Sequence, residues 1–225
     1  IDLNKVVSAI KADDFHFAKT KLLSLENTIG GKVLPLSYLK EARECVDKHN
    51  LALHLDGARV YNAAVKLGVD ITEITQYFDS VSICLSKGLG APVGSLLLGS
   101  KALIDKARRW RKVLGGGMRQ AGMLAAAGQY ALEHHVARLA EDHDNAAYLA
   151  EQLNTLAGFD TSTFQIDTNI VYANVAEHID LKAVAHALKE QNMLFSPGKP
   201  LRLVTHLGVT KQDIDSFISA LAAEI

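Results

Sequence analysis

Residues 81–94 read VSICLSKGLGAPVG, a short apolar run followed by a serine, a lysine and a glycine-rich corner. The apolar run predicts a buried strand, and the glycines after it predict a sharp turn of the backbone. Lys87 is therefore expected where a buried strand ends. A desolvated lysine loses its charge readily, and a neutral amine can form a Schiff base with a carbonyl compound. Lys87 is the first candidate for a chemical role.

The segments upstream of this stretch alternate between strand and helix patterns. Strands are expected at 22–25, 51–55 and 81–85, with a returning strand at 95–98. Helices are expected at 4–12, 59–66 and 71–77. A further helix is expected after Ser37, which can cap it together with Glu41 near the reciprocal capping position. This alternation indicates βαβ units and a parallel sheet covered on both faces. Ligands bind beyond the carboxyl ends of such strands, where both Asp56 and Lys87 fall.

The rest of the chain predicts a long helical region and then a second, smaller α/β unit. Helix is expected from 100 to 154 with a break at the triple glycine 115–117, followed by strands at 159–165, 169–175, 194 and 201–204 and helices at 180–191 and from 211. We therefore divide the chain into a large domain, residues 1–130, and a small carboxyl-terminal domain with its linking helix, residues 131–225.

Composition excludes several classes of function. Lys and Arg number 24 against 25 Asp and Glu, a net charge of −1, so no global field attracts nucleic acid or an acidic membrane. The basic run 108–112 is better explained by a solvated helix face or a subunit contact. Cys45 and Cys84 have no metal or CxxC spacing and are expected as buried thiols, and no metal site is predicted. With no membrane-spanning run and no leader, a cytoplasmic protein is expected.

Asp56 strengthens the case for Lys87. It ends the strand 51–55 and begins the sequence Asp56-Gly57-Ala58-Arg59. A carboxylate beside a pyridine nitrogen keeps that nitrogen protonated, and a protonated ring withdraws electrons from a substrate Cα. The alternative, compatible with this role, is that Asp56 caps the helix that starts near Arg59.

Five segments then carry a family resemblance. They are LLSLENT (22–28), HLDGAR (54–59), ICLSKGLG (83–90), RWRKVLGGGMRQ (109–120) and RLVTH (202–206). Together they closely resemble the low-specificity L-threonine (L-allo-threonine) aldolases, which are pyridoxal 5′-phosphate (PLP) enzymes of the aspartate aminotransferase fold, fold type I. The resemblance covers essentially the whole chain. It implies retro-aldol cleavage of threonine or allo-threonine to glycine and an aldehyde.

The resemblance also implies roles for individual residues. Lys87 would form the Schiff base with PLP, Asp56 would pair with the pyridine nitrogen, and Arg59 would lie near the phenolic oxygen of the ring. Arg202 would hold the substrate carboxylate, for which a planar guanidinium is suited, although a surface arginine at a strand end is the alternative. His16 would accept the proton of the β-hydroxyl group, although an ordinary, partly buried histidine is the alternative.

Two departures from the family pattern leave other readings open. Ile29-Gly30-Gly31 follow LENT where family members often have His-Asn-Gly, and the first third of the family, with its phosphate cradle and ring-stacking histidine, has no counterpart. Another fold-type-I PLP enzyme, a β-eliminating lyase or an aminotransferase, is one alternative, and an inactive fragment without the phosphate cradle is another. The family also implies a homotetramer, a dimer of dimers, and a small amino-acid substrate.

Overall fold

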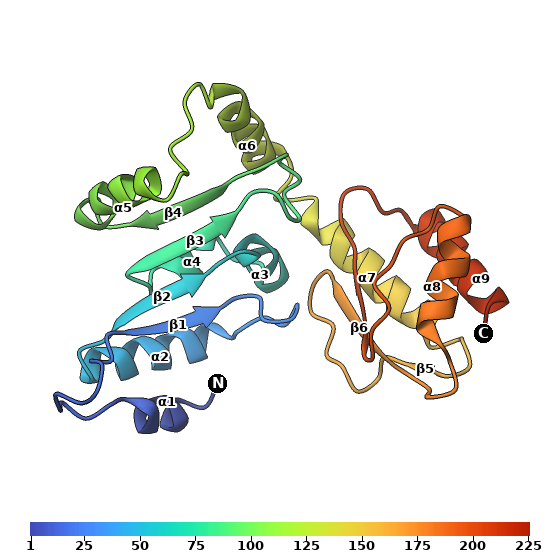
Figure 1. The fold of residues 1–225 in the computed structure, drawn as a ribbon, viewed down its shortest axis with the longest axis horizontal. Helices are drawn as coiled ribbons and strands as arrows, with labels where there is room; N and C mark the ends of the chain where they lie inside the picture. Colours follow the sequence, from blue (N-terminus) through green and yellow to red (C-terminus); the bar gives the residue numbers. More distant parts are fainter.

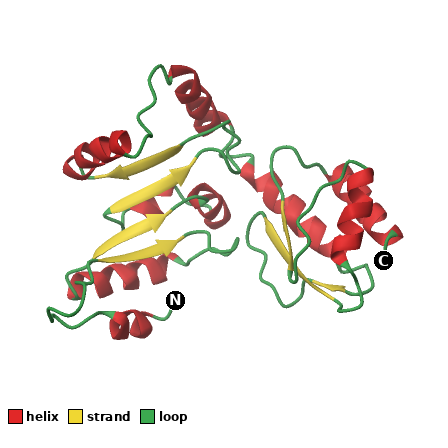
Figure 2. Cartoon of the chain, in the orientation of Figure 1, coloured by secondary structure: helices red, strands yellow, loops and turns green.

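The computed structural model describes every residue from Ile1 to Ile225. A four-stranded sheet with its helices forms one part, a three-stranded sheet with its helices forms the other, and the helix α7 (Leu139–Leu153) joins them (Figure 1). The loops that follow the parallel strands of the large sheet lie on the side that faces the small domain (Figure 2). The α/β class predicted from the alternating pattern is confirmed.

The large sheet has the strand order β1-β2-β3-β4. Its strands are β1 (Leu22–Glu26), β2 (Ala52–Asp56), β3 (Ser80–Cys84) and β4 (Ser95–Gly99). The first three are parallel, and β4 returns antiparallel to β3. Glu26 pairs with Asp56, and Asp56 pairs with Ser82, so the carboxyl ends of β1 to β3 lie at one edge of the sheet.

One face of this sheet carries the apolar core. The helices that cover it are α2 (Leu36–Lys48), α3 (Val60–Leu67) and α4 (Ile71–Thr75). Leu53 and Leu55 of β2 are fully buried there, together with Val46 of α2 and Ile74 of α4. The alternation of strand side chains places these leucines on the covered face and polar side chains on the other face.

The other face differs from the prediction. His54, Ser82 and Cys84 are only half-buried, and Ser24 is exposed. The helices of this chain therefore cover β1 to β3 on one face, whereas the sequence pattern predicted cover on both. The reason is visible in the strands themselves: they alternate between apolar and polar residues, as strands with one solvated face do.

The remaining helices of the large part lie at its margins (Figure 1). They are α1 (Leu3–Ala9), α5 (Lys101–Val113) and α6 (Gly122–His134). Asp2 caps α1 by accepting a hydrogen bond from the Asn4 amide. No residue of α5 is buried, and all five residues of β4 are exposed.

The small part is built on an antiparallel sheet of order β5-β6-β7. Its elements are β5 (Phe159–Asp160), β6 (Ile170–Val175), α8 (Leu181–Glu190), β7 (Leu201–Val204) and α9 (Lys211–Ala223). Leu153, Leu188, Leu201 and Leu221 are fully buried in one core that α7, α8, β7 and α9 share. The two parts therefore have separate cores, while the predicted domain boundary after residue 130 stays a prediction.

Several predicted element bounds are wrong. Pro35, not Ser37, occupies the N-cap of α2, because Pro35 has an extended backbone and Ser37 already lies inside the helix. The strand expected at 159–165 ends at Asp160, and the strand expected at Leu194 is absent. The long helical region is broken a second time, between α6 and α7.

No helix in the structure has the length and apolar character needed to span a membrane.

The two parts meet at hydrogen bonds between buried or half-buried groups. The Val33 amide donates to Asp167 Oδ2 at 2.9 Å, and Thr168 Oγ1 donates to the Gly31 carbonyl at 2.7 Å. On the helical side, Asn62 Nδ2 of α3 lies 3.1 Å from His143 Nε2 of α7. Because an amide nitrogen only donates, His143 Nε2 is the acceptor in this pair.

The position of His143 predicts an acid-sensitive junction. Burial lowers the pKa of His143 below the ordinary 6.5, and Lys66 lowers it further, while Asp142 and Asp144 act in the opposite direction. The native state thus favours the neutral ring, so its contribution to stability is complete above pH about 6.5 and is lost as the pH falls toward the folded-state pKa. We expect the free energy of unfolding, measured in urea between about pH 7.5 and 5, to fall less steeply in His143→Gln than in the parent chain.

The matched control is His178→Gln, because His178 is exposed. Its pH dependence should follow that of the parent chain. Identical slopes for the parent chain and His143→Gln would show that this histidine does not couple acid to unfolding.

Candidate active site

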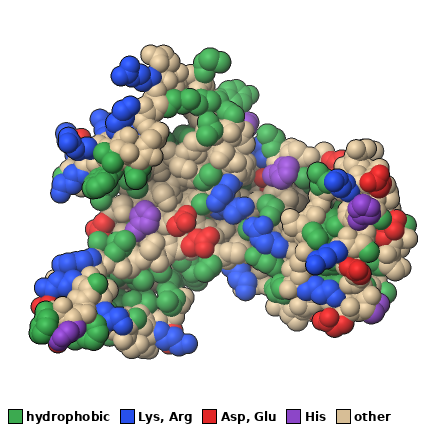
Figure 3. Space-filling model, viewed as in Figure 1, with side chains coloured by type: hydrophobic (Ala, Val, Ile, Leu, Met, Phe, Trp, Pro, Cys, Tyr) green, Lys and Arg blue, Asp and Glu red, His purple; other side chains and the backbone are tan.

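Three ionisable side chains follow the carboxyl ends of neighbouring strands. Glu26 and Asp56 are the last residues of β1 and β2 and are paired in register, and Lys87 lies three residues beyond the end of β3. All three side chains are exposed at the edge that faces the small part. Figure 3 shows acidic and basic side chains gathered on this face where the two parts of the chain meet. This is the edge at which parallel α/β sheets bind ligands.

The backbone after Asp56 holds it close to β3. The Gly57 amide donates to the Ser82 carbonyl at 2.8 Å, and a Cβ added at Gly57 would lie 2.7 Å from that same oxygen. Only glycine allows this close approach. Asp56 Oδ1 accepts a hydrogen bond from the Ala58 amide at 3.0 Å. The predicted helix cap is therefore wrong: Arg59 is the N-cap residue of α3, and Asp56 stabilises the turn before it.

The turn that carries Lys87 is fixed on both sides. The Ala91 amide donates to the Leu85 carbonyl at 2.9 Å, and the Gly90 amide donates to the Lys87 carbonyl at 2.9 Å. Gly90 has a φ of +70°, which favours glycine. Gly88 is buried, and a Cβ there would lie 2.9 Å from Leu139 of α7. The backbone at Lys87 is thus packed directly against the helix that joins the two parts.

The side chain of Lys87 is exposed and forms no ion pair, so the structure does not show the desolvation that the sequence pattern predicted. Its charge does affect Cys84 at the end of β3. Burial raises the pKa of the Cys84 thiol, but hydrogen bonds with Ser86 and the charge of Lys87 outweigh it, so the net pKa is lowered. Lys87 therefore lies close enough to Cys84 for its positive charge to act on the thiol.

Arg59 of the large part and Arg202 of the small part lie near each other. Burial lowers the pKa of Arg59, and the nearby charge of Arg202 lowers it further, while Cys84, Glu26 and Tyr172 act in the opposite direction. Arg59 Nε is buried and has no hydrogen-bond partner. Two guanidinium groups repel each other unless an anion lies between them. The structure thus places Asp56 and Lys87 at neighbouring strand ends and Arg202 close to Arg59, where the two parts of the chain meet. We call the region between these residues the interdomain crevice.

His16 lies away from this crevice. It belongs to the segment between α1 and β1, which enters the sheet at the amino ends of the strands, where the Ala52 amide donates to the Lys21 carbonyl (Figure 1). The exposed His16 ring lies 2.8 Å from Asp14 Oδ1. Within one chain, therefore, the sheet separates His16 from Lys87.

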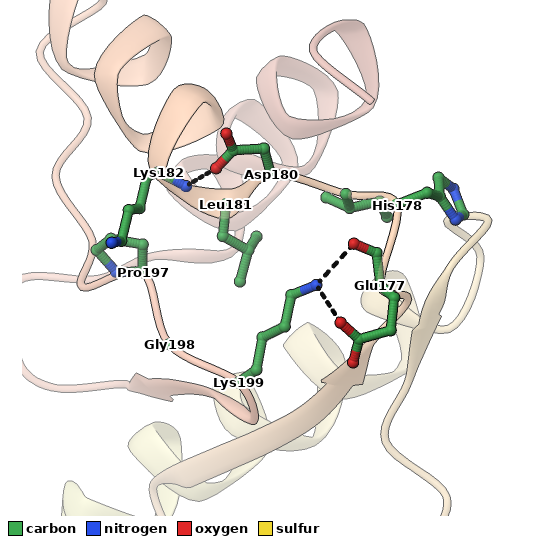
Figure 4. A pocket seen from close by; sticks show the side chains of 9 residues that line it. Glu177, His178, Asp180, Leu181, Lys182, Pro197, Gly198 and Lys199 are labelled. Carbon is green, nitrogen blue, oxygen red and sulfur yellow. Dashed lines mark hydrogen bonds and ion pairs between the residues drawn. The ribbon is translucent and has the colours of Figure 1, made fainter.

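A second cavity has a different character. It has a volume of about 510 Å³ and lies between the β6–α8 connection and the residues that lead into β7 (Figure 4). Lys199 Nζ is satisfied there by the carbonyls of Ala176 and Glu177 and lies 3.8 Å from the Glu177 carboxylate. Asp180 accepts from the first amides of α8. Lys199 and Asp180 are thus already engaged within the chain, whereas the Lys182 ammonium forms no ion pair.

Sequence reasoning missed two supporting residues. His135 donates through Nδ1 to the Leu89 carbonyl at 2.6 Å and so holds the turn after Lys87. Asn62 lies beside Gly88 and is buried. Neither is adjacent in sequence to Lys87, and only the packing of α6 and α3 against the turn reveals them.

No three side chains among His, Cys, Asp and Glu converge as metal ligands.

Known proteins resemble this chain in sequence and in fold. A low-specificity L-threonine aldolase from Escherichia coli strain K12 is 56% identical over 214 residues, which are 95% of this chain and 63% of that protein. The chain thus spans less than two thirds of the length of this relative. Among solved structures, threonine aldolase from Leishmania major matches with a TM-score of 0.76 at 19% identity, covering 99% of this chain and 67% of the other.

A serine palmitoyltransferase from S. paucimobilis, solved with bound PLP, matches with a TM-score of 0.72 at 19% identity, covering 99% of this chain and 57% of the other. At these identities the two structures show the fold alone, which is that of the fold-type-I PLP enzymes. The family model described as beta-eliminating lyase matches residues 1–177, most of the chain. The chain belongs to the beta-eliminating lyase family.

Proposed function

We propose that this protein is a PLP-dependent aldolase that cleaves L-threonine or L-allo-threonine to glycine and acetaldehyde. The observation that supports the proposal is the position of Lys87 and Asp56 at neighbouring strand ends, together with the closeness of Arg59 and Arg202. The 56% identity to the E. coli aldolase supports this reaction over others of the same fold. The full activity is a proposal because the chain covers 63% of that relative.

The residues of the crevice fit PLP. Lys87 offers an exposed amine without an ion-pair partner, the group that an aldehyde requires. Asp56 offers a carboxylate at the neighbouring strand end for a ring nitrogen. The buried Arg59 Nε–H has no partner in the chain and is free to donate to an oxygen of the cofactor. These three residues would hold the aldehyde, nitrogen and oxygen functions of the ring.

When bound, PLP supplies a protonated ring that withdraws the electron pair developing at the substrate Cα as the Cα–Cβ bond breaks. Asp56 keeps the proton on the ring nitrogen. Arg202 binds the α-carboxylate of the substrate and thereby orients the Cα–Cβ bond. Lys87, on its fixed turn, is the amine at which the cofactor is held covalently between turnovers. Gly57 lets the turn after Asp56 lie against the Ser82 carbonyl of β3 and so fixes Asp56 beside the strand that leads to Lys87.

We also infer a cytoplasmic homo-oligomer, a dimer of dimers. Exposed apolar side chains on β4 and along α5 to α6, such as Leu97, Trp110 and Met123, support contacts between subunits. The two free thiols, Cys45 and Cys84, support a reducing compartment.

The test is titration of the purified chain with PLP, followed by borohydride reduction and peptide mass mapping. We expect one pyridoxyl adduct, on Lys87, and release of glycine and acetaldehyde from L-allo-threonine. Release of ammonia with a 2-oxo acid would identify a β-eliminating lyase instead. A label spread evenly over many lysines, with no aldehyde released, would contradict the proposal.

A further inference from the structure

Tyr172 lies directly beside Arg202 in the small sheet. The two residues are register partners on the antiparallel strands β6 and β7. Side chains that oppose each other in this way share one face of the sheet. Val171 and Ala173, on either side of Tyr172, are buried in the small core, so the face that carries Tyr172 and Arg202 is the opposite one.

The ring of Tyr172 extends from this face toward the large part of the chain. It stacks on Phe164 with a centroid distance of 5.6 Å and an interplanar angle of 29°. A Cβ added at Gly30, in the loop after β1, would lie 3.7 Å from the Tyr172 hydroxyl. The hydroxyl is thus held across the crevice by packing on both sides, and it takes part in no hydrogen bond within the chain.

The electrostatics of the crevice favour an anion next to this hydroxyl. Arg59 and Arg202 are close enough for the charge of Arg202 to lower the pKa of Arg59, and neither forms an ion pair within 4.0 Å. Tyr172 is among the groups that act on Arg59. A phenol hydroxyl can donate or accept a hydrogen bond. Because Arg59 and Arg202 attract an anion, the Tyr172 hydroxyl beside them is placed to donate to that anion.

We propose that Tyr172 is a substrate-binding residue whose hydroxyl donates a hydrogen bond to the α-carboxylate held by Arg202. This inference rests on the proposed function for the identity of the substrate. Arg202 supplies the charge, and Tyr172, locked against Phe164, supplies a donor of fixed direction. Because a carboxylate is present in the substrate before and after C–C cleavage, this interaction stabilises the ground state and the transition state equally.

The first test is Tyr172→Phe, which keeps the ring and its contact with Phe164 and removes only the hydroxyl. We expect KM for L-allo-threonine to rise about tenfold while kcat stays within about twofold, the signature of lost uniform binding. Tyr130→Phe is the matched control, because Tyr130 is exposed on α6, and it should leave both constants unchanged. Parent-like KM in Tyr172→Phe, or a fall in kcat alone, would overturn the proposal.

A second readout does not depend on catalysis. In the PLP-free protein, the arginine Nε–H resonances are followed by NMR during titration with acetate, with methylammonium as the control ion. We expect acetate, and not methylammonium, to shift the Arg59 and Arg202 resonances, with half-saturation about tenfold higher in Tyr172→Phe. Equal half-saturation in parent and variant would overturn the role of Tyr172. A parent chain that binds acetate but releases no aldehyde would instead refute the aldolase assignment.

Discussion

Lys87→Ala is expected to abolish PLP-dependent aldehyde release, with a loss on the order of 10³-fold or more, while the protein stays folded. The amine that holds the cofactor is removed, and no other lysine follows a strand end of the crevice. Because the Lys87 side chain is exposed and unpaired, its truncation leaves no cavity and no buried charge. The measurement combines acetaldehyde release from L-allo-threonine with peptide mapping after borohydride reduction, which should find no pyridoxyl adduct.

Lys48→Ala is the matched control. Lys48 is exposed in the last turn of α2, forms no ion pair, and precedes β2, so it lies at the amino edge of the sheet. Its variant should match the parent chain in label and in activity. If Lys87→Ala still carried a stoichiometric label and released aldehyde at the parental rate, Lys87 could not be the attachment site.

The strand ends that build the site were predictable because their signals are local. A short apolar run bounded by glycine needs no tertiary information to be interpreted as a strand and a turn, so β2, β3, Asp56 and Lys87 fall where the sequence places them. Crossover connections then bring the carboxyl ends of parallel strands to one edge. That Lys87 and Asp56 lie at neighbouring strand ends is therefore a consequence of pattern and topology together.

The features that were missed depend on contacts between distant segments. His135 holds the turn after Lys87, and Tyr172 meets Gly30, through packing that no local pattern encodes. The role of His16 stays a prediction: within one chain its segment lies at the amino edge of the sheet, away from Lys87. The strand expected at 159–165 ends early because Asp160 Oδ1 accepts from the Ser162 amide and the Thr161 carbonyl accepts from the Phe164 amide, so the chain turns after Asp160. Leu194 is exposed and pairs with no strand.

Asp142→Ala is expected to lower the free energy of unfolding by about 3–5 kcal/mol, because it removes the buried carboxylate of Arg138 and leaves that largely buried arginine with only the exposed Glu141 at 3.8 Å. The side chain of Asp142 is 0% exposed and that of Arg138 15%, and the shortest of their contacts is 2.6 Å. The carbonyl of Asp142 also accepts from Thr205 Oγ1 at 2.6 Å, which fixes β7 and hence Arg202 to α7. Urea unfolding at neutral pH measures the loss, and Asp144→Ala, an exposed carboxylate on the same helix, should change stability by less than about 0.5 kcal/mol.

The double variant Arg138→Met with Asp142→Leu separates the loss of the pair from the strain of an unpaired charge. Replacement of a buried ion pair by apolar side chains is often neutral, so this variant should recover most of the stability that Asp142→Ala loses. If the double variant is as unstable as the single one, the cost lies in the packing of α7 against the small core. Recovery would show that the loss in Asp142→Ala comes from the unpaired charge of Arg138. Since Leu139 of α7 packs on the turn of Lys87 and Thr205 ties β7 to the same helix, the variant would also report whether α7 sets the distance between Lys87 and Arg202.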